Sequence, residues 1–386
     1  MKPRRKSPTP TISGTQYSGT RSTLISTMQS PMKATMSPAI ISLVPEPSAM
    51  PEILETGAVD VKAPSADSSP PPESGIIGAM SPFSGAPVTA GDLLTLEELG
   101  RLRRTSPVRG AGLVLHAWAT MGAAMALYAL WPSPWTLGLA VVVIGTRQLG
   151  LVVLMHETSH WLLFSSLRAN TVVGTWFCAA PMGQDLRAYR RRHHLHHRRT
   201  QQPDDPDLPL SAALPLSRGR FALAILCDLS GVTAATEVLG WRPWRDGLAA
   251  AWRRARAPLI ANAVLAAALV ALGGWSLYLL TWVLPWATWY RLVTRIRNIL
   301  EHGLVPGAED PLRSARSVGA GRLARALVAP YGVNYHLEHH LLVFVPCWKL
   351  GQAHALLLAK GYGARMERSP SYLEVLGRAA AGRADR

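Results

Sequence analysis

Four of the twelve histidines in this 386-residue chain fall within five residues of one segment, RAYRRRHHLHHRRT, at residues 187–200. On an α-helix, His193, His196 and His197 occupy positions i, i+3 and i+4, which places three imidazoles on one face within a single turn. His194 is rotated away from His193 by about 100°. Because neutral imidazole is the commonest metal-binding side chain, the spacing predicts a metal site on this helix.

Two other segments, MHETSH and NYHLEHH, carry histidines at similar spacing, and one more histidine ends the segment RNILEH. The pair in MHETSH lies one helical turn apart, and NYHLEHH repeats the H-x-x-H-H spacing of the first segment. These six residues are His156, His160, His302, His336, His339 and His340. With the first three they make nine imidazoles, which are too many for one metal ion and enough for two.

The composition indicates a membrane protein, because 48% of the residues are hydrophobic and only 17% are charged, against about 25% in soluble domains. Apolar stretches at 111–131 and 135–155 flank the turn WPSPW, and shorter ones at 258–273 and 275–290 meet at two glycines. The first two are long enough to cross a hydrocarbon core of about 30 Å. We therefore expect an all-α integral membrane fold with four transmembrane helices in two hairpins.

The charge pattern predicts how these helices are oriented. The formal net charge is +16, and the arginines flank apolar stretches instead of forming a separate basic domain, so we expect contact with a membrane surface and not with nucleic acid. The two tight turns carry no charge, whereas the opposite helix ends are basic. By the positive-inside rule, both termini and a helical cap that holds the histidine segments are expected on the cytoplasmic side.

Domain boundaries follow from shifts in composition. Residues 1–90 are rich in Ser, Thr, Pro and Met and show no periodicity, which predicts a disordered tail, with a targeting segment or an overlong start as alternatives. A membrane domain is expected over 91–360 and a polar C-terminal tail over 361–386. The three cysteines form no CxxC pair, so neither a disulfide framework nor a thiolate zinc site is expected.

The motifs HETSH, HHLHH and NYHLEHH resemble the three histidine boxes of the membrane-bound fatty acid desaturase family, in spacing and in order, over residues 110–350. The resemblance implies that the eight histidines of these boxes bind two iron ions. It adds His302 as a further ligand and Asn298, four residues earlier, as a residue that contacts the metal through water. It also implies O2 as co-substrate. No His-Pro-Gly-Gly signature of a fused cytochrome occurs, so electrons are expected from a separate donor such as ferredoxin or cytochrome b5.

The leading hypothesis is a desaturase that introduces a double bond into the acyl chain of an acyl lipid or acyl thioester. A hydroxylase or ketolase of the same superfamily is the nearest alternative, because the boxes do not distinguish these reactions. HETSH alone also matches the H-E-x-x-H motif of zinc metalloproteases, with Glu157 as general base, but the second hairpin offers no acidic third ligand. A metal transporter would need acidic or histidine residues along the spans, whereas these histidines lie at the ends.

Several charged residues near the boxes are candidates for supporting roles. Each of three glutamates adjoins a proposed ligand and is expected either to accept a hydrogen bond from it or to be solvated. Three aspartates follow the second box and are expected to cap and pair with the arginine-rich helix. Arg147 is the one charge well inside a predicted span, where it meets an acid or a substrate carboxylate, or else snorkels. The glutamates are Glu157, Glu301 and Glu338, and the aspartates are Asp204, Asp205 and Asp207.

Overall fold

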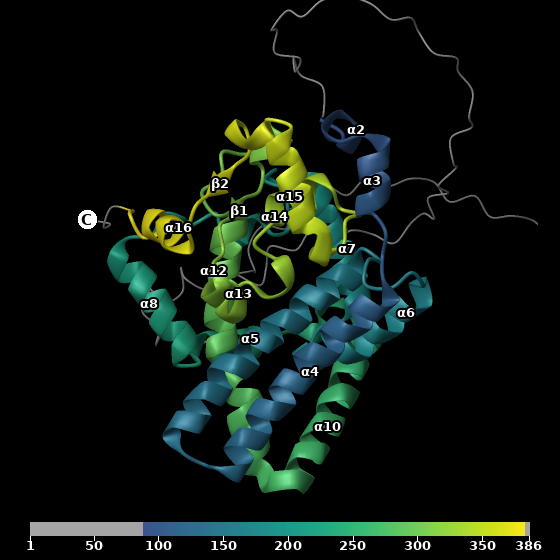
Figure 1. The fold of residues 1–386 in the computed structure, drawn as a ribbon. Helices are drawn as coiled ribbons and strands as arrows, with labels where there is room; N and C mark the ends of the chain where they lie inside the picture. The colour runs from purple at the N-terminus through teal and green to yellow at the C-terminus, as the bar shows by residue number, and fades with distance from the viewer. Residues whose placement is uncertain (1–87, 383–386) are drawn as a thin grey trace, which may run out of the picture. The chain divides into compact units, whose positions relative to one another are not determined.

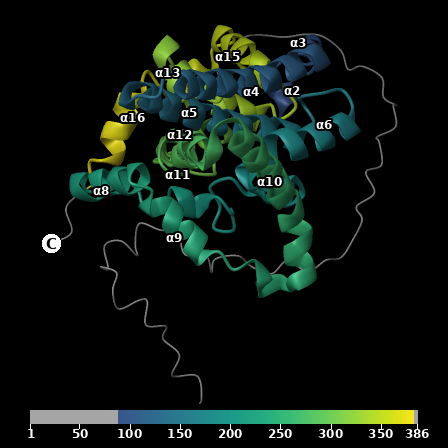
Figure 2. The same ribbon diagram turned by 90° about the horizontal axis from the view of Figure 1, so that it is seen from below.

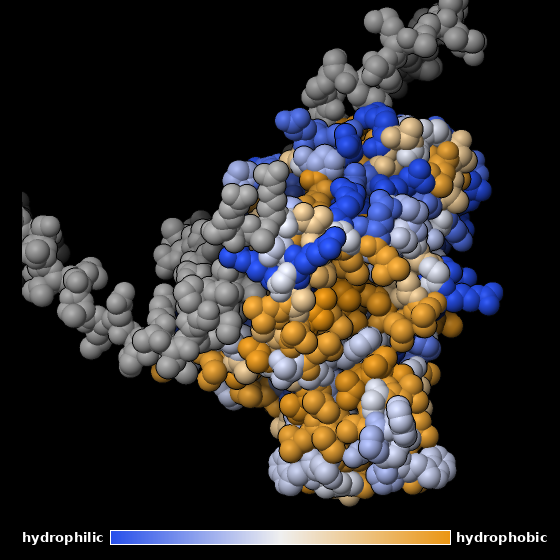
Figure 3. Space-filling model, turned by 90° about the vertical axis from the view of Figure 1, so that its left-hand side faces the viewer, coloured by the Kyte–Doolittle hydropathy of each residue, from blue (hydrophilic) through white to orange (hydrophobic). Residues whose placement is uncertain are grey.

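The described part of the chain is built almost entirely from helices. The computed structural model describes residues 88–382, so the predicted N-terminal tail falls almost wholly outside the described residues. Three segments in this part are long and apolar enough to cross a membrane, namely 107–130, 134–159 and 248–302. On the face seen in Figure 3, apolar residues cover most of the middle and lower part of the described chain, while the upper part is mostly hydrophilic.

Helices α4 (Pro107–Leu130) and α5 (Pro134–Ser159) form the first hairpin (Figure 1). Each begins with a serine cap followed by proline, and the Ser133 hydroxyl accepts a hydrogen bond from the backbone N–H of Thr136 at 3.2 Å. Gly110 allows close approach of the chain after α5, because a Cβ atom there would lie 2.0 Å from the carbonyl oxygen of Leu163. Both helices extend a few residues beyond the predicted spans.

The second apolar region reverses at the two glycines. Helix α10 (Leu248–Tyr278) contains a break at Gly273 and Gly274, and Gly274 has a φ of 75°, which favours glycine. The chain then turns back through the π-helix η6 (Leu279–Val283), α11 (Leu284–Ala287) and α12 (Trp289–His302), as Figure 1 shows. The predicted segments 258–273 and 275–290 are too short. The helices continue into the basic residues on either side, since α10 begins at Leu248 and α12 ends at His302.

The segment between the two apolar regions is a series of shorter helices. In chain order they are α6 (Leu167–Val173), η2 (Gly174–Ala179), η3 (Ala180–Met182), α7 (Leu186–Arg199), α8 (Arg218–Leu229) and α9 (Val232–Gly240). Helices α8 and α9 meet at 76°, and together they are apolar enough to count as one broken span. Figure 2 shows them on the opposite side of α11 and α12 from α4 and α5.

The C-terminal part folds over the ends of the spans. It comprises α13 (Arg322–Leu327), α14 (His336–Leu341), α15 (Leu350–Ala359), α16 (Tyr372–Ala379) and the short parallel strands β1 (Ser317–Val318) and β2 (Arg368–Ser369). The prediction of a polar tail over 361–386 is wrong for the described residues up to 382. Helix α16 packs against α12, with Val375 and Ala379 fully buried one turn apart. This narrow apolar face lies among polar residues, so the sequence pattern does not reveal it.

Arg147 and Tyr331 fasten this C-terminal part to the spans. The Arg147 Nη2 atom donates to the carbonyl oxygen of Ala326 at 2.9 Å, and its guanidinium lies 5.6 Å from the centre of the Tyr331 ring. The Tyr331 ring also fills the space above Gly150, where a Cβ atom would lie 2.9 Å from it. Arg147 is 8% exposed, so the expectation that it snorkels is wrong.

Candidate metal centre

The nine predicted histidines converge into two groups. Within each group, one nitrogen atom from every histidine lies within 4.8 Å of the corresponding atoms of the others. The first group contains His156, His160, His193, His197 and His339. The second group contains His196, His302, His336 and His340.

Arg190 sets the position of α7 against the end of α5. Its Nε and Nη2 atoms donate to the carbonyl oxygens of Ser159 and Thr158 at 3.1 and 3.0 Å, so it satisfies the last carbonyls of α5. Its guanidinium also lies 3.6 Å from the centre of the Trp161 ring. Helix α7 is therefore held across the end of α5, where its histidines face those of HETSH.

In the first group the Nε2 atoms point toward one another. The Nε2 atom of His193 lies 2.9 Å from those of His160 and His197, and the Nε2 atom of His197 lies 3.0 Å from that of His339. A neutral imidazole has a single N–H, so these rings cannot satisfy one another as donors and acceptors. The buried Nε2 atom of His156 has no hydrogen-bond partner among the described residues. The convergence of nitrogen atoms therefore fits a bound metal ion.

The second group repeats this arrangement with four histidines. The Nε2 atom of His302 lies 3.2 Å from that of His196 and 2.9 Å from that of His336, which in turn lies 3.1 Å from that of His340. Helix α7 supplies histidines to both groups, as does α14. Residues three or four apart in one helix therefore belong to two neighbouring groups, each of which could hold a metal ion.

Burial favours the neutral form of His160, His193 and His339. It lowers the pKa of His160 from 6.5 to about 3, and the nearby positive charges of His194 and Arg190 lower it further. Burial also holds the pKa values of His193 and His339 well below the ordinary value, with smaller contributions from neighbouring histidines. Since neutral imidazole is the form that binds metal, the site is prepared for metal at neutral pH.

Asp205 orients one ligand of the second group. Its Oδ1 atom accepts a hydrogen bond from Nδ1 of His196 at 2.8 Å, which leaves Nε2 of His196 directed at the metal position. The backbone N–H groups of Gln201 and Asp207 donate to the Asp205 carboxylate at 2.9 and 2.8 Å. The sequence does not reveal this role, because an acid close behind a histidine motif is its only signal.

The neighbouring aspartates behave as the sequence predicts. Asp207 pairs with Arg192 at 2.7 Å, and Asp204 pairs with Arg199 at 3.1 Å. These ion pairs hold the loop after α7 against the helix.

All three glutamates beside the ligands are buried, so none is solvated. The Oε1 atom of Glu157 lies 3.4 Å from Nδ1 of His156, and its Oε2 atom accepts the backbone N–H of Cys347 at 2.8 Å. This arrangement does not favour a zinc protease, whose general base must be free to act on water. Glu338 instead accepts a hydrogen bond from Nδ1 of His354 at 2.6 Å and thereby joins α14 to α15.

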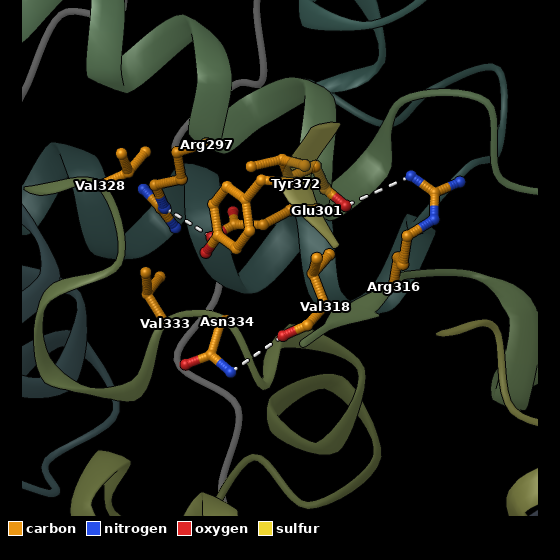
Figure 4. Close-up of a pocket in the computed structure, with 9 residues that line it drawn as sticks. Arg297, Glu301, Arg316, Val318, Val328, Val333, Asn334 and Tyr372 are labelled. Carbon is orange, nitrogen blue, oxygen red and sulfur yellow. Dashed lines mark hydrogen bonds and ion pairs between the residues drawn. The ribbon is translucent and has the colours of Figure 1, made fainter. Parts of the chain in front are cut away.

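Glu301 lines a small, mostly apolar cavity (Figure 4). Its Oε1 atom accepts a hydrogen bond from Arg297 at 2.6 Å, and its Oε2 atom lies 3.5 Å from Nε2 of His336. Tyr372 lines the same cavity, as does Asn334, whose buried Oδ1 atom has no partner among the described residues. Glu301 therefore joins the second group to a cavity whose walls are mainly valine and leucine side chains with a few polar groups.

Arg316 is a supporting residue that the sequence analysis did not identify. It is fully buried, and it donates to the carbonyl oxygens of Gly303 and Leu304 at 2.8 and 3.1 Å and to Glu367 at 3.1 Å. These bonds satisfy the backbone beyond the end of α12, directly after His302. Nothing in the sequence distinguishes Arg316 from the many exposed arginines.

Two predicted features lie outside the groups. His194 is half-buried and its Nε2 atom lies 3.1 Å from the carbonyl oxygen of Ser159. Asn298 lies on α12 four residues before His302, and its water-mediated contact with the metal stays a prediction.

Comparisons with known proteins agree with this geometry. A family model described as fatty acid desaturase matches residues 132–371. The chain is 29% identical over 276 residues to dihydrorhizobitoxine desaturase of Bradyrhizobium elkanii, covering 67% of this chain and 77% of that protein. It is 28% identical over 273 residues to the beta-carotene ketolase of Paracoccus sp. (strain PC1), covering 68% and 94%. The resemblance seen in the histidine motifs is thus confirmed, and the chain belongs to the fatty acid desaturase family of oxidoreductases.

Proposed function

We propose that this protein is a di-iron, O2-dependent desaturase that introduces a double bond into the acyl chain of an acyl lipid or acyl thioester. The observation that carries the proposal is the pair of interleaved groups of buried histidines, five in one and four in the other. Two iron ions bound there would supply an oxidant strong enough to remove hydrogen from an unactivated methylene. The nitrogen-rich donor set suits iron, which the nine histidines would hold directly and Asn298 would contact through water.

The chain's own residues prepare the site. Asp205 and Glu157 fix the orientation of His196 and His156, which keeps the metal-facing nitrogens in place. A cavity of about 10 Å³ beside these ligands is lined by Val153 and Leu350 as well as by His156 and His339, and it has room for about one water molecule.

The proposed topology has four membrane crossings, with the cap and both termini on the cytoplasmic side. Three candidate spans support it, since the third reverses at Gly273 and Gly274 and so provides two arms. The basic residues at the histidine-bearing ends support the orientation. Electrons would come from a separate acidic carrier such as ferredoxin or cytochrome b5.

A ketolase or hydroxylase is the second candidate. It is supported by the alignment with the beta-carotene ketolase, which extends over 94% of that protein. Growth under 18O2 separates the two reactions, because a hydroxylated or ketolated product gains labelled oxygen whereas a desaturated product gains only a double bond.

The proposal is tested in membranes from cells that express the chain or its His339→Ala variant. We expect about two iron ions per chain and an O2-dependent unsaturated product, resolved by gas chromatography with mass spectrometry, in the first sample, and one ion or fewer and no product in the second. Zinc without iron, or identical lipids in both samples with and without O2, would overturn it.

A further inference from the structure

The arginines of α7 fall into two classes. Arg190, Arg192 and Arg199 are engaged with backbone carbonyls or aspartates, as described above. The other class is exposed and forms no hydrogen bond, ion pair or ring contact with any residue between 88 and 382. Its members are Arg187, Arg191 and Arg198.

These three arginines form one stripe. At 100° per residue, they lie within about 40° of one another around the helix axis. The mean direction of the three ligand histidines of α7 lies about 150° from the stripe. We call the exposed side that carries Arg187, Arg191 and Arg198 the arginine face of α7.

Folding does not account for the arginine face. Arg187 and Arg191 are four residues apart, where like charges repel along a helix. Arg187 also stands in the first turn, where the positive end of the helix dipole disfavours a cation. Only Arg198, in the last turn, gains from the dipole. Two of the three charges therefore destabilise α7 unless a negatively charged partner is present.

His194 connects this side of the helix with the first histidine group. It lies about 20° from Arg187 around the axis, and its ring centre is 5.4 Å from that of His160, at an interplanar angle of 33°. The arginine face is thus separated from the metal positions by a single helix, about 10 Å thick.

We propose that the arginine face docks a small acidic one-electron carrier protein, and that the electron enters through His194 to His160. This inference rests on the proposed function, which requires such a carrier. The reduced iron–sulfur or haem group of the carrier would lose one electron, and a ferric ion held by the histidines would gain it, with no bond made or broken. Two transfers per turnover, with two protons from solvent and two hydrogen atoms from the substrate, balance the reduction of O2 to two water molecules.

The docking step is tested by binding, which requires no turnover. The probe is a plant-type [2Fe–2S] ferredoxin, and its affinity for the purified protein in neutral detergent is measured at several salt concentrations. The triple variant R187Q/R191Q/R198Q should bind about tenfold more weakly at low salt, since each exposed pair contributes a factor of about two. Its dependence on salt should also be flatter.

The matched control, R103Q/R104Q/R168Q, removes the same charge from exposed positions outside α7 and should keep most of the affinity. Equal losses in the two triple variants would overturn the proposal. A loss that appears only in vesicles of anionic lipid, and not in detergent, would show that the face contacts lipid headgroups and would also overturn it.

The route through His194 is tested with H194Q, which keeps a donor for Ser159 but removes the ring beside His160. Ferredoxin should bind this variant normally and reduce its iron more slowly, while reduction by dithionite and the iron content stay unchanged. An unchanged rate with ferredoxin would exclude the route. If dithionite fails to reduce the unsubstituted centre, the proposed function fails, whatever the binding results.

Discussion

Nδ1 of His196 and Oδ1 of Asp205 lie 2.8 Å apart, and their side chains are only 3% and 1% exposed. A buried pair of this kind fixes the ring of His196 in one orientation, with its Nε2 atom beside that of His302. The second histidine group therefore depends on a carboxylate that is not itself one of its members.

Replacing Asp205 should weaken metal binding in the second group. We expect Asp205→Ala to lower iron affinity and product formation about tenfold to a hundredfold, as for other residues that orient metal ligands. Elemental analysis of the purified variant measures the effect. Asp204→Ala is the matched control, because Asp204 is 58% exposed and pairs only with Arg199. Equal iron content in the two variants would contradict the assignment.

Removing a histidine from one group should be distinguishable from removing one outside both. His339→Ala takes a ligand from the first group, so iron should fall from about two ions per chain to one or fewer, with loss of turnover. His194→Gln should retain both ions, since His194 belongs to neither group. Iron per chain is measured against protein concentration in the same sample. Two ions retained in His339→Ala would refute the grouping.

The contact between α4 and the chain after α5 predicts a stability difference between two glycines of α4. Gly110→Ala should lower the free energy of unfolding by about 1–3 kcal/mol, because its Cβ atom would meet the Leu163 carbonyl oxygen. Gly112→Ala should leave stability unchanged or raise it, since no atom lies within 4 Å of the new methyl group. Thermal unfolding in detergent compares them, and equal midpoints would argue against this packing.

The depressed pKa of His160 predicts the pH dependence of the metal-free protein. Between pH 6.5 and about 3 the unfolded chain binds a proton that the folded site excludes. Stability should therefore fall as the pH drops through 6.5, by up to about 1.4 kcal/mol per pH unit for each such histidine. Denaturant unfolding at pH 7.5, 6.0 and 5.0 measures the slope. His160→Ala should reduce it, and an unchanged slope would show that His160 does not contribute.

The histidine motifs were predictable because their spacing is local. His193, His196 and His197 share a face by helix geometry alone, and this same periodicity predicts that His194 points elsewhere. The long helices α4 and α5 followed from two long apolar stretches, of which only the second contains a charge, Arg147. In each case a short-range pattern was sufficient, because the structure concerned is formed by neighbouring residues.

Arg316 and Arg147 were harder to interpret because most of their partners are backbone atoms outside the local sequence, and Asp205 because its partner His196 lies in a segment that offers several arginines as well. Arg316 bonds to carbonyl oxygens twelve and thirteen residues earlier, and Arg147 reaches the carbonyl of Ala326, 179 residues away. Carbonyl groups occur at every residue, so the sequence does not indicate which of them an arginine will bond to. Helix α16 was not predicted, because its buried face is only about two turns long and gives too short a periodic pattern.

The sharing of α7 and α14 between the two histidine groups limits how the chain can vary. A single residue inserted between His193 and His196 would rotate the following ligands by about 100° and misdirect them in both groups at once. The same holds between His336 and His339. By contrast, residues 305–309 carry no ligand and lie in a loop that tolerates changes in length. Insertions and deletions among relatives should therefore accumulate in such loops. In α7 and α14, by contrast, the number of residues between the ligand histidines should stay constant.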